Sequence, residues 1–166
     1  MPHLAAVVIE RVLRVAGVVE IRARARASEA SCPDCGTVSR RVHAGYHRCL
    51  SDLAVAGQSM RIVLSVRRFK CADTDCARAT FVEQIADLTT RYGRHTTLLR
   101  GVLESIGLAL ARRAGARLAA RIGLRVGRMT LLRLVRALPD PEPDAVTGVG
   151  VDDFALRRGH RYGTYH

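Results

Sequence analysis

The sequence has almost no lysine and no long apolar run. Only Lys70 among its 27 lysines and arginines is a lysine. No stretch approaches the roughly 18 uninterrupted apolar residues that a membrane-spanning helix needs. The first apolar run, at residues 4–9, follows no basic segment of the kind that opens a signal peptide. Glycines interrupt the most arginine-rich segment, which argues against a long amphipathic helix on a membrane surface. We therefore expect a cytoplasmic protein without a membrane role.

Acidic residues are also scarce, and one segment has none. The chain carries 15 Asp and Glu against 27 Lys and Arg, for a net charge of +12. Residues 105–139 contain eight of the arginines and no acid. Such a segment is typical of a surface that binds nucleic acid, because a guanidinium can donate two hydrogen bonds to a phosphate or a guanine edge. A GC-rich coding bias gives the same arginine content, so composition alone leaves both explanations open.

Four of the five cysteines form two close pairs. Cys32 and Cys35 stand in CPDCG, and Cys71 and Cys76 stand in CADTDC. Both pairs lie at turn signals, where two thiolates can face the same side, as tetrahedral zinc requires. In a reducing cytosol this pattern favours metal over disulfides, although buried or redox-active thiols are the alternative. Because four cysteines leave no coordination position for water, we predict one structural Zn²⁺ per chain.

Three other potential ligands lie between the cysteine pairs. Cys49 has no close cysteine partner, and we expect a buried thiol; the other interpretation is that it serves as an alternative zinc ligand. His43 and His47 are predicted to lie outside the zinc shell, because histidines at isolated positions are more often surface or hydrogen-bonded core residues.

Hydrophobic spacing divides the chain into a β-rich half and a helical half. Residues 18–26 and 60–69 alternate apolar or small positions with charged ones, which predicts half-buried strands. Residues 96–138 show apolar positions at intervals of three and four, which predicts helices. The tract PDPEPD at residues 139–144 holds three of the five prolines and predicts a linker.

Residues 115–138 have the spacing of two short helices joined by a turn. Ala119 is small where the helices would cross, and Gly123 permits the turn. A structural helical hairpin shares this spacing, but the absence of acids favours a surface that lies beside phosphates. Gly127 stands where Ser or Thr would cap the second helix better. The expected buried contacts are Leu118, Ile122, Met129, Leu132 and Leu134 or Val135. The predicted DNA-binding residues are Arg117, Arg121, Arg125, Arg128, Thr130, Arg133 and Arg136.

Six blocks of the sequence match a known family when they are taken in order. CPDCG, RRFKC, FVEQ, ARLAARIGL, TLLRLVRALP and GVDDFALRRGHRYGT resemble successive blocks of the ISL-three family of insertion-sequence transposases, over about residues 30–164. The resemblance implies a zinc-binding domain and a helix-turn-helix that recognise the terminal inverted repeats of a mobile element. It also implies an RNase H-like domain in which three acids of the DDE type hold two divalent ions, Mg²⁺ in the intact family enzyme.

The first of those acids falls, by motif, on Asp152. Its neighbour Asp153 would point to the opposite side of a strand. The sequence stops two residues after Thr164, and the second Asp and the Glu of the family pattern do not occur in it. We therefore expect a truncated transposase fragment that is not an enzyme by itself, with Asp152 exposed near a terminus. An enzyme would require another chain to supply the missing carboxylates.

Together these features predict an α+β protein. A small β-rich zinc-binding module precedes an all-α helix-turn-helix domain and a short strand-like remnant of an RNase H-like domain. We place an N-terminal strand or helix segment that packs on the zinc module at 1–30, the zinc module at 31–85, the helix-turn-helix at 90–138, a linker at 139–145 and the start of the catalytic domain at 146–166.

The expected partner is double-stranded DNA at transposon ends, in the bacterial nucleoid. A homodimer, or a heteromer with intact transposase, is a further expectation. The alternative function is a zinc-stabilised protein-interaction module without specific DNA binding. In that case RRF, FVEQ and the apolar positions of residues 96–110 would form a dimer surface.

Overall fold

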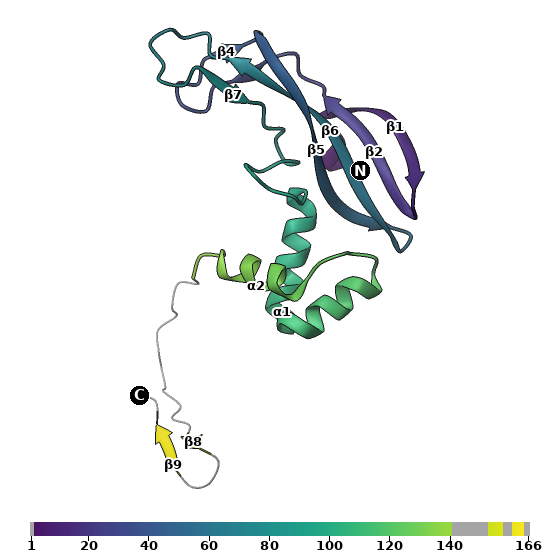
Figure 1. Cartoon of the computed structure of the whole chain (residues 1–166), viewed down its shortest axis with the longest axis vertical. Helices are drawn as coiled ribbons and strands as arrows, with labels where there is room; N and C mark the ends of the chain where they lie inside the picture. The colour runs from purple at the N-terminus through teal and green to yellow at the C-terminus, as the bar shows by residue number, and fades with distance from the viewer. Residues whose placement is uncertain (1, 141–152, 158–160, 165–166) are drawn as a thin grey trace.

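The protein consists of a β-sheet body with a helical unit at one end (Figure 1). The computed structural model describes residues 2–140, 153–157 and 161–164. A short 3-10 helix, η1 (Pro2–Leu4), precedes the sheet. The strands of the sheet are β1 (Val7–Val15), β2 (Val18–Ala25), β5 (Val42–Val55), β6 (Gln58–Lys70) and β7 (Thr80–Val82). The described fold is α+β, as the sequence predicts.

Two hairpins join to form the sheet in the order β1-β2-β6-β5. Each hairpin turns at an Ala-Gly pair with positive φ, Ala16-Gly17 and Ala56-Gly57, the backbone that tight two-residue hairpins need. β2 and β6 pair in parallel from Val19 opposite Met60 to Arg24 opposite Ser65. β7 pairs with the last part of β6. The predicted strands at 18–26 and 60–69 are therefore neighbours, and the N-terminal segment shares one sheet with the region that follows.

The core of the sheet lies on one face of β2 and β6. Alternate side chains of both strands are buried, because successive residues of a strand point to opposite faces. Leu50 of β5 and Leu88 of the following loop are also fully buried here. The buried positions of β2 and β6 are Ile21, Ala23, Ala25, Met60, Ile62, Leu64 and Val66.

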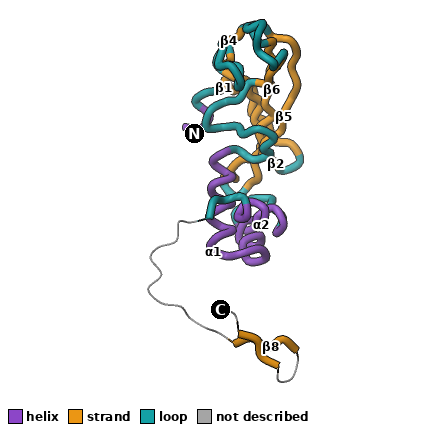
Figure 2. The backbone as a smooth tube through the Cα atoms, turned by 90° about the vertical axis from the view of Figure 1, so that its left-hand side faces the viewer, coloured by secondary structure: helices purple, strands orange, loops and turns teal. Residues whose placement is uncertain are grey.

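The cysteine-bearing loops lie at the end of the sheet that is far from the helices. The first loop is flanked by the short strands β3 (Ala30–Ser31) and β4 (Val38–Ser39), which pair antiparallel. The second loop connects β6 to β7. The tube view shows the same separation, with β4 at one end of the body and the helices at the other (Figure 2).

The helical unit contains α1 (Thr97–Arg121) and α2 (Arg128–Arg136). α1 is kinked at Ala111, whose φ of 54° and ψ of −162° interrupt the helical backbone, so it consists of two helical pieces. Residues 122–127 form the turn to α2, where Gly123 has a φ of 83°. Neither helix is long and apolar enough to cross a lipid bilayer. The buried residues of this unit are Leu99, Leu103, Ile106, Ala119, Leu124 and Leu131.

The predicted packing of the two short helices is partly wrong. Ala119 is fully buried and Gly123 forms the turn, as expected. Leu118, Ile122 and Met129, however, are 41%, 44% and 47% exposed. The reason is the first piece of α1, which acts as a third helix. The first piece of α1 is contacted by small residues of the second piece and by Leu131 of α2, and these contacts form the described core of the unit.

Two separate contacts fasten the helical unit to the sheet. The buried carboxylate of Asp52 in β5 accepts from the Thr96 hydroxyl at 2.6 Å, and the Thr96 hydroxyl oxygen caps α1 by accepting from the Leu99 amide at 3.2 Å. At the second contact, the Ser59 hydroxyl donates to the Gly123 carbonyl at 2.7 Å. A Cβ added to Gly123 would lie 2.4 Å from the Gly57 carbonyl oxygen, so the two turns touch through their backbones.

The described part of the C-terminal region is a small antiparallel pair. β8 (Asp153–Arg157) pairs with β9 (Arg161–Thr164), with Asp153 opposite Thr164. The linker beyond residue 140 and the first residues of the expected catalytic domain, at 146–152 with the candidate acid Asp152, lie outside the described residues.

Candidate metal centre and basic surface

The four paired cysteines converge on one point. The sulfur atoms of Cys32, Cys35, Cys71 and Cys76 all lie within 4.8 Å of one another. Cys32 and Cys76 are 3.9 Å apart, and Cys35 and Cys71 are 3.6 Å apart. A zinc–sulfur bond of about 2.3 Å gives a tetrahedron with edges of about 3.8 Å, so these distances fit one zinc ion. They are too long for disulfides, whose sulfurs are about 2.05 Å apart. The cluster suits a structural zinc ion, as predicted.

Backbone amides approach three of the four sulfurs in the same way. The amides of Thr37, Asp73 and Arg78 hydrogen-bond to the sulfurs of Cys35, Cys71 and Cys76. In each case the donor lies two residues after the cysteine. Such donors reduce the negative charge that four thiolates place around one ion, and they fix the direction of each sulfur. This arrangement is the second observation that fits zinc.

The thiols differ in how readily they lose a proton before metal binds. Hydrogen bonds from the Thr37 hydroxyl and amide lower the pKa of Cys35 to about 7. Burial raises the pKa of Cys71 to about 12. Zinc must therefore displace a proton from Cys71 when it binds.

A small aromatic core supports the cysteine cluster. Phe69 of β6 and Phe81 of β7 are stacked with ring centroids 5.9 Å apart, and both pack in one cluster with Cys32. On the surface, Arg78 pairs with Asp34 at 2.6 Å, so a residue that follows Cys76 is tied to the turn between Cys32 and Cys35. The zinc module is thus stabilised by apolar packing of the two phenylalanines and by an ion pair between its two cysteine-bearing loops.

The other candidate ligands lie outside the cluster. Cys49, His43 and His47 are exposed on β5 and do not join the four cysteines among the described residues. The expectation of a buried thiol at Cys49 is wrong. The neighbouring Leu50 points into the core, so the alternation of the strand places Cys49 on the opposite face.

The predicted DNA-binding arginines lie on the surface of the helical unit. Thr130 is half-buried, whereas the arginines are exposed. α2 buries Leu131 and turns Arg133 and Arg136 away from the core. None of the ion pairs found among the described residues includes one of these arginines. The exposed set is Arg117, Arg121, Arg125, Arg128, Arg133 and Arg136.

Gly127 precedes α2 without a side-chain cap, as the sequence predicts. In the zinc-binding region, Arg67 is tied to the buried carboxylate of Glu83 at 2.6 Å.

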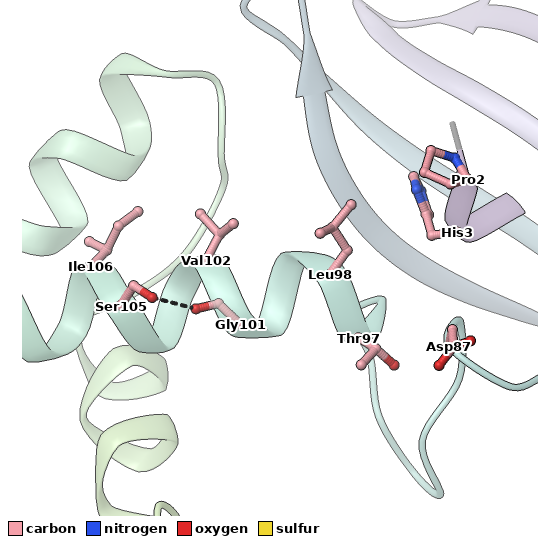
Figure 3. Close-up of a pocket in the computed structure, with 9 residues that line it drawn as sticks. All are labelled: Pro2, His3, Asp87, Thr97, Leu98, Gly101, Val102, Ser105 and Ile106. Atoms are coloured by element: carbon pink, nitrogen blue, oxygen red, sulfur yellow. Dashed lines mark hydrogen bonds between the residues drawn. The ribbon is translucent and has the colours of Figure 1, made fainter.

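An apolar pocket of about 700 Å³ lies between η1 and the first piece of α1. Figure 3 shows that Leu98, Val102 and Ile106 lie along one side, with His3 across from them. His3 is engaged by Asp52 at 2.8 Å, and the Ser105 hydroxyl donates to the Gly101 carbonyl at 3.0 Å. His3 and the Ser105 hydroxyl are therefore each engaged by a neighbouring group.

Sequence reasoning missed one exposed feature. Tyr92, in the loop between β7 and α1, is 83% exposed and has a φ of 60°. The sequence Arg-Tyr-Gly-Arg shows no helical or strand periodicity, so the unusual position of Tyr92 is evident only from its backbone conformation and exposure.

Comparison with known families supports the resemblance to transposases. Residues 28–76, which contain all four cysteines of the cluster, match the model of the zinc-finger of transposase IS204/IS1001/IS1096/IS1165. Comparisons of the chain with curated proteins and with solved structures gave no match.

Proposed function

We propose that this chain binds double-stranded DNA as the recognition part of a transposase-related protein. The second piece of α1 and α2 act as a helix-turn-helix, and α2 enters the major groove. The observation that carries the proposal is the set of exposed arginines on this unit, none of which is paired with a described carboxylate. The zinc-finger match at residues 28–76 supports the same class of protein.

The charge distribution explains why DNA fits better than another partner. Residues 105–139 contain no acid, so nothing within this segment compensates the charge of its arginines. A phosphate backbone supplies that compensation and releases counterions, which gives strongly salt-dependent binding. Arg128, the first residue of α2, and Arg125, in the turn before it, lie near the end of a recognition helix that contacts base edges.

The resemblance suggests the target and limits the chemistry. The proposed target is the terminal inverted repeat of a mobile element. We also propose that these residues bind DNA without cutting it, because two-metal cleavage needs several carboxylates and the resemblance assigns only Asp152. Labelled repeat ends that are cut by the purified chain with Mg²⁺ or Mn²⁺ would overturn this part.

A binding titration tests the main proposal. The zinc-loaded chain is titrated with a terminal-repeat duplex and with a scrambled duplex across a salt series. Arg125→Ala and Arg128→Ala should each weaken binding. Each should also make the slope of log binding constant against log salt concentration shallower, by about 0.9 for each phosphate that the variant leaves without a cation. Arg14→Ala, on the exposed β1 edge, is the matched control and should change little. Equal affinity of the parent, Arg125→Ala and Arg128→Ala for the repeat would overturn the proposal.

Self-association is a second candidate function. Leu98, Leu108 and Leu110 of α1 are 41%, 64% and 40% exposed, which is a large apolar surface for one helix. The RRF and FVEQ segments of β6 and β7 offer less apolar surface for a dimer than the sequence suggests, because Phe69 and Phe81 pack on each other. Sedimentation of the parent and of Leu108→Glu distinguishes the two functions. A dimer that this variant abolishes, with DNA binding independent of Arg125 and Arg128, favours the protein-interaction module.

A further inference from the structure

A second basic surface lies on the sheet body, apart from α2. A groove of about 1220 Å³ runs between the zinc-module loops and the loop that precedes α1. Arg48 and Arg68 of β5 and β6 line it, and Arg91, Tyr92 and Arg94 form part of its border. None of these residues belongs to the zinc cluster or to helices α1 and α2.

The groove carries positive charge that its own acids do not neutralise. Its lining includes the carboxylates of Glu29, Asp34 and Glu83. Each is already paired, to Arg40, Arg78 and Arg67 respectively. Four lining arginines have no carboxylate partner among the described residues, and they are Arg48, Arg68, Arg91 and Arg94. An anionic ligand is therefore favoured.

Tyr92 is held in a conformation that does not serve the core. Its φ of 60° lies in the left-handed region, which is unfavourable for a side chain other than glycine. Its ring is 83% exposed and contacts the guanidinium of Arg91, whose central carbon lies 4.9 Å from the ring centroid. An exposed aromatic ring on strained backbone gains little from folding, and such strain clusters at binding sites.

The loop that presents Tyr92 is fixed from below. One terminal nitrogen of Arg48 donates to the carbonyls of Thr90 and Gly93, at 2.5 Å each. A Cβ at Gly93 would lie 2.3 Å from the Thr90 hydroxyl oxygen, so the turn closes tightly on itself. The ring is thus presented by a buttressed turn, which reduces the entropy that a ligand must overcome.

We propose that this groove binds single-stranded or unpaired DNA, with phosphates on its arginines and a base stacked on Tyr92. A charged groove combined with an exposed aromatic ring is the arrangement by which proteins hold single strands. In a duplex the faces of the bases are covered by their neighbours, so the ring would have no stacking partner there. The site is distinct from α2 and does not depend on duplex recognition by that helix.

Fluorescence anisotropy with a labelled oligothymidine of about 12 nucleotides tests the proposal on the zinc-loaded full chain. Tyr92→Ala should weaken binding about tenfold, because one base can no longer stack on the ring. Tyr92→Phe keeps the ring and should stay within about threefold of the parent. Arg91→Ala should reduce the salt slope by about 0.7 for each phosphate that this arginine neutralises. Arg14→Ala is the exposed control, and Arg125→Ala should weaken duplex binding only.

A stability measurement separates binding from a merely structural role. Tyr92→Asn should raise the urea midpoint, because Asn tolerates positive φ better, and should still weaken binding of the oligonucleotide. Unchanged oligonucleotide affinity in Tyr92→Ala would overturn the proposal. Equal weakening of duplex and single strand would also overturn it, since the loop would then be a general duplex contact. Binding of a polyglutamate peptide as tight as that of the oligonucleotide, and independent of Tyr92, would assign the groove to acidic peptides instead.

Discussion

The hydroxyl of Thr96 donates to the fully buried carboxylate of Asp52 at 2.6 Å and accepts from the amide of Leu99 at 3.2 Å. A residue of the sheet therefore orients the residue that caps the first helix. The other oxygen of Asp52 lies 2.8 Å from His3. The sheet, the N-terminus and the helical unit meet at this one carboxylate.

Removing the Thr96 hydroxyl should destabilise the protein markedly. Thr96→Ala deletes a helix cap and leaves one oxygen of a buried carboxylate without its donor, so we expect a loss of about 2–3 kcal/mol. Urea unfolding measures the effect. Thr96→Ser keeps the hydroxyl and should retain most of the stability, whereas Thr97→Ala, at an exposed position, should change it by under about 0.5 kcal/mol. Similar losses in the Ala and Ser variants would show that the hydroxyl is not responsible.

Loss of one cluster cysteine should abolish zinc binding. Cys71→Ser replaces a soft thiolate with a weak ligand, so the zinc content should fall from about one per chain to nearly none. The melting temperature should fall as well, because metal binding contributes to folding of the module. Cys49→Ser is the matched control, since Cys49 lies outside the cluster and should leave the zinc content unchanged. A zinc content that Cys71→Ser leaves intact would argue against this ligand set.

Glu20 should make stability depend on pH in the acid range. Its buried carboxylate accepts from Arg22 at 3.0 Å and Arg61 at 2.8 Å, and these hydrogen bonds hold its pKa below 4.5 despite burial. A lowered folded-state pKa contributes stability above the unfolded pKa of 4.5, and this contribution is lost as pH falls through the folded value.

Urea unfolding of the parent and Glu20→Gln at pH 7, 5.5 and 4 measures that contribution. The parent should be more stable at pH 7 and 5.5, and the difference should narrow at pH 4. The control is Glu10→Gln, whose exposed ion pair with Arg24 should matter little at neutral pH. If the stability difference between the parent and Glu20→Gln stayed constant down to pH 4, ionisation of Glu20 could not be its cause.

Two neighbouring glycines should respond in opposite ways. Gly123→Ala places a side chain at a φ of 83° and 2.4 Å from the Gly57 carbonyl oxygen, so we expect a loss above about 2 kcal/mol. Gly127 has an extended backbone and open space around it. Gly127→Ser should therefore supply the missing cap of α2 and add a few tenths of a kcal/mol. Thermal unfolding compares both variants, and equal losses would contradict this account.

The metal ligands and two strands were predictable because local sequence determines them. A tetrahedral zinc site requires close ligand pairs at turns, and Cys32, Cys35, Cys71 and Cys76 meet that requirement. The alternation in β2 and β6 reports one buried face. The parallel pairing of these two strands was not predictable, since it joins residues about 40 positions apart that carry no signal of each other.

The helical packing was predicted less well because a third partner decides it. Leu118, Ile122 and Met129 fit a two-helix interface, but the kink at Ala111 brings the first piece of α1 into the core. The groove also depends on tertiary structure. Arg48 and Tyr92 are 44 residues apart, and their relationship exists only once the sheet has formed.

The two contacts between sheet and helices have a mechanical consequence. A helical unit attached to the sheet at one contact could rotate about it. Contacts at both Thr96 and Gly123 oppose that rotation. The two contacts together restrain the angle between α2 and the groove more than either contact would alone. A DNA molecule that touches both surfaces would then have to bend or open to fit that angle.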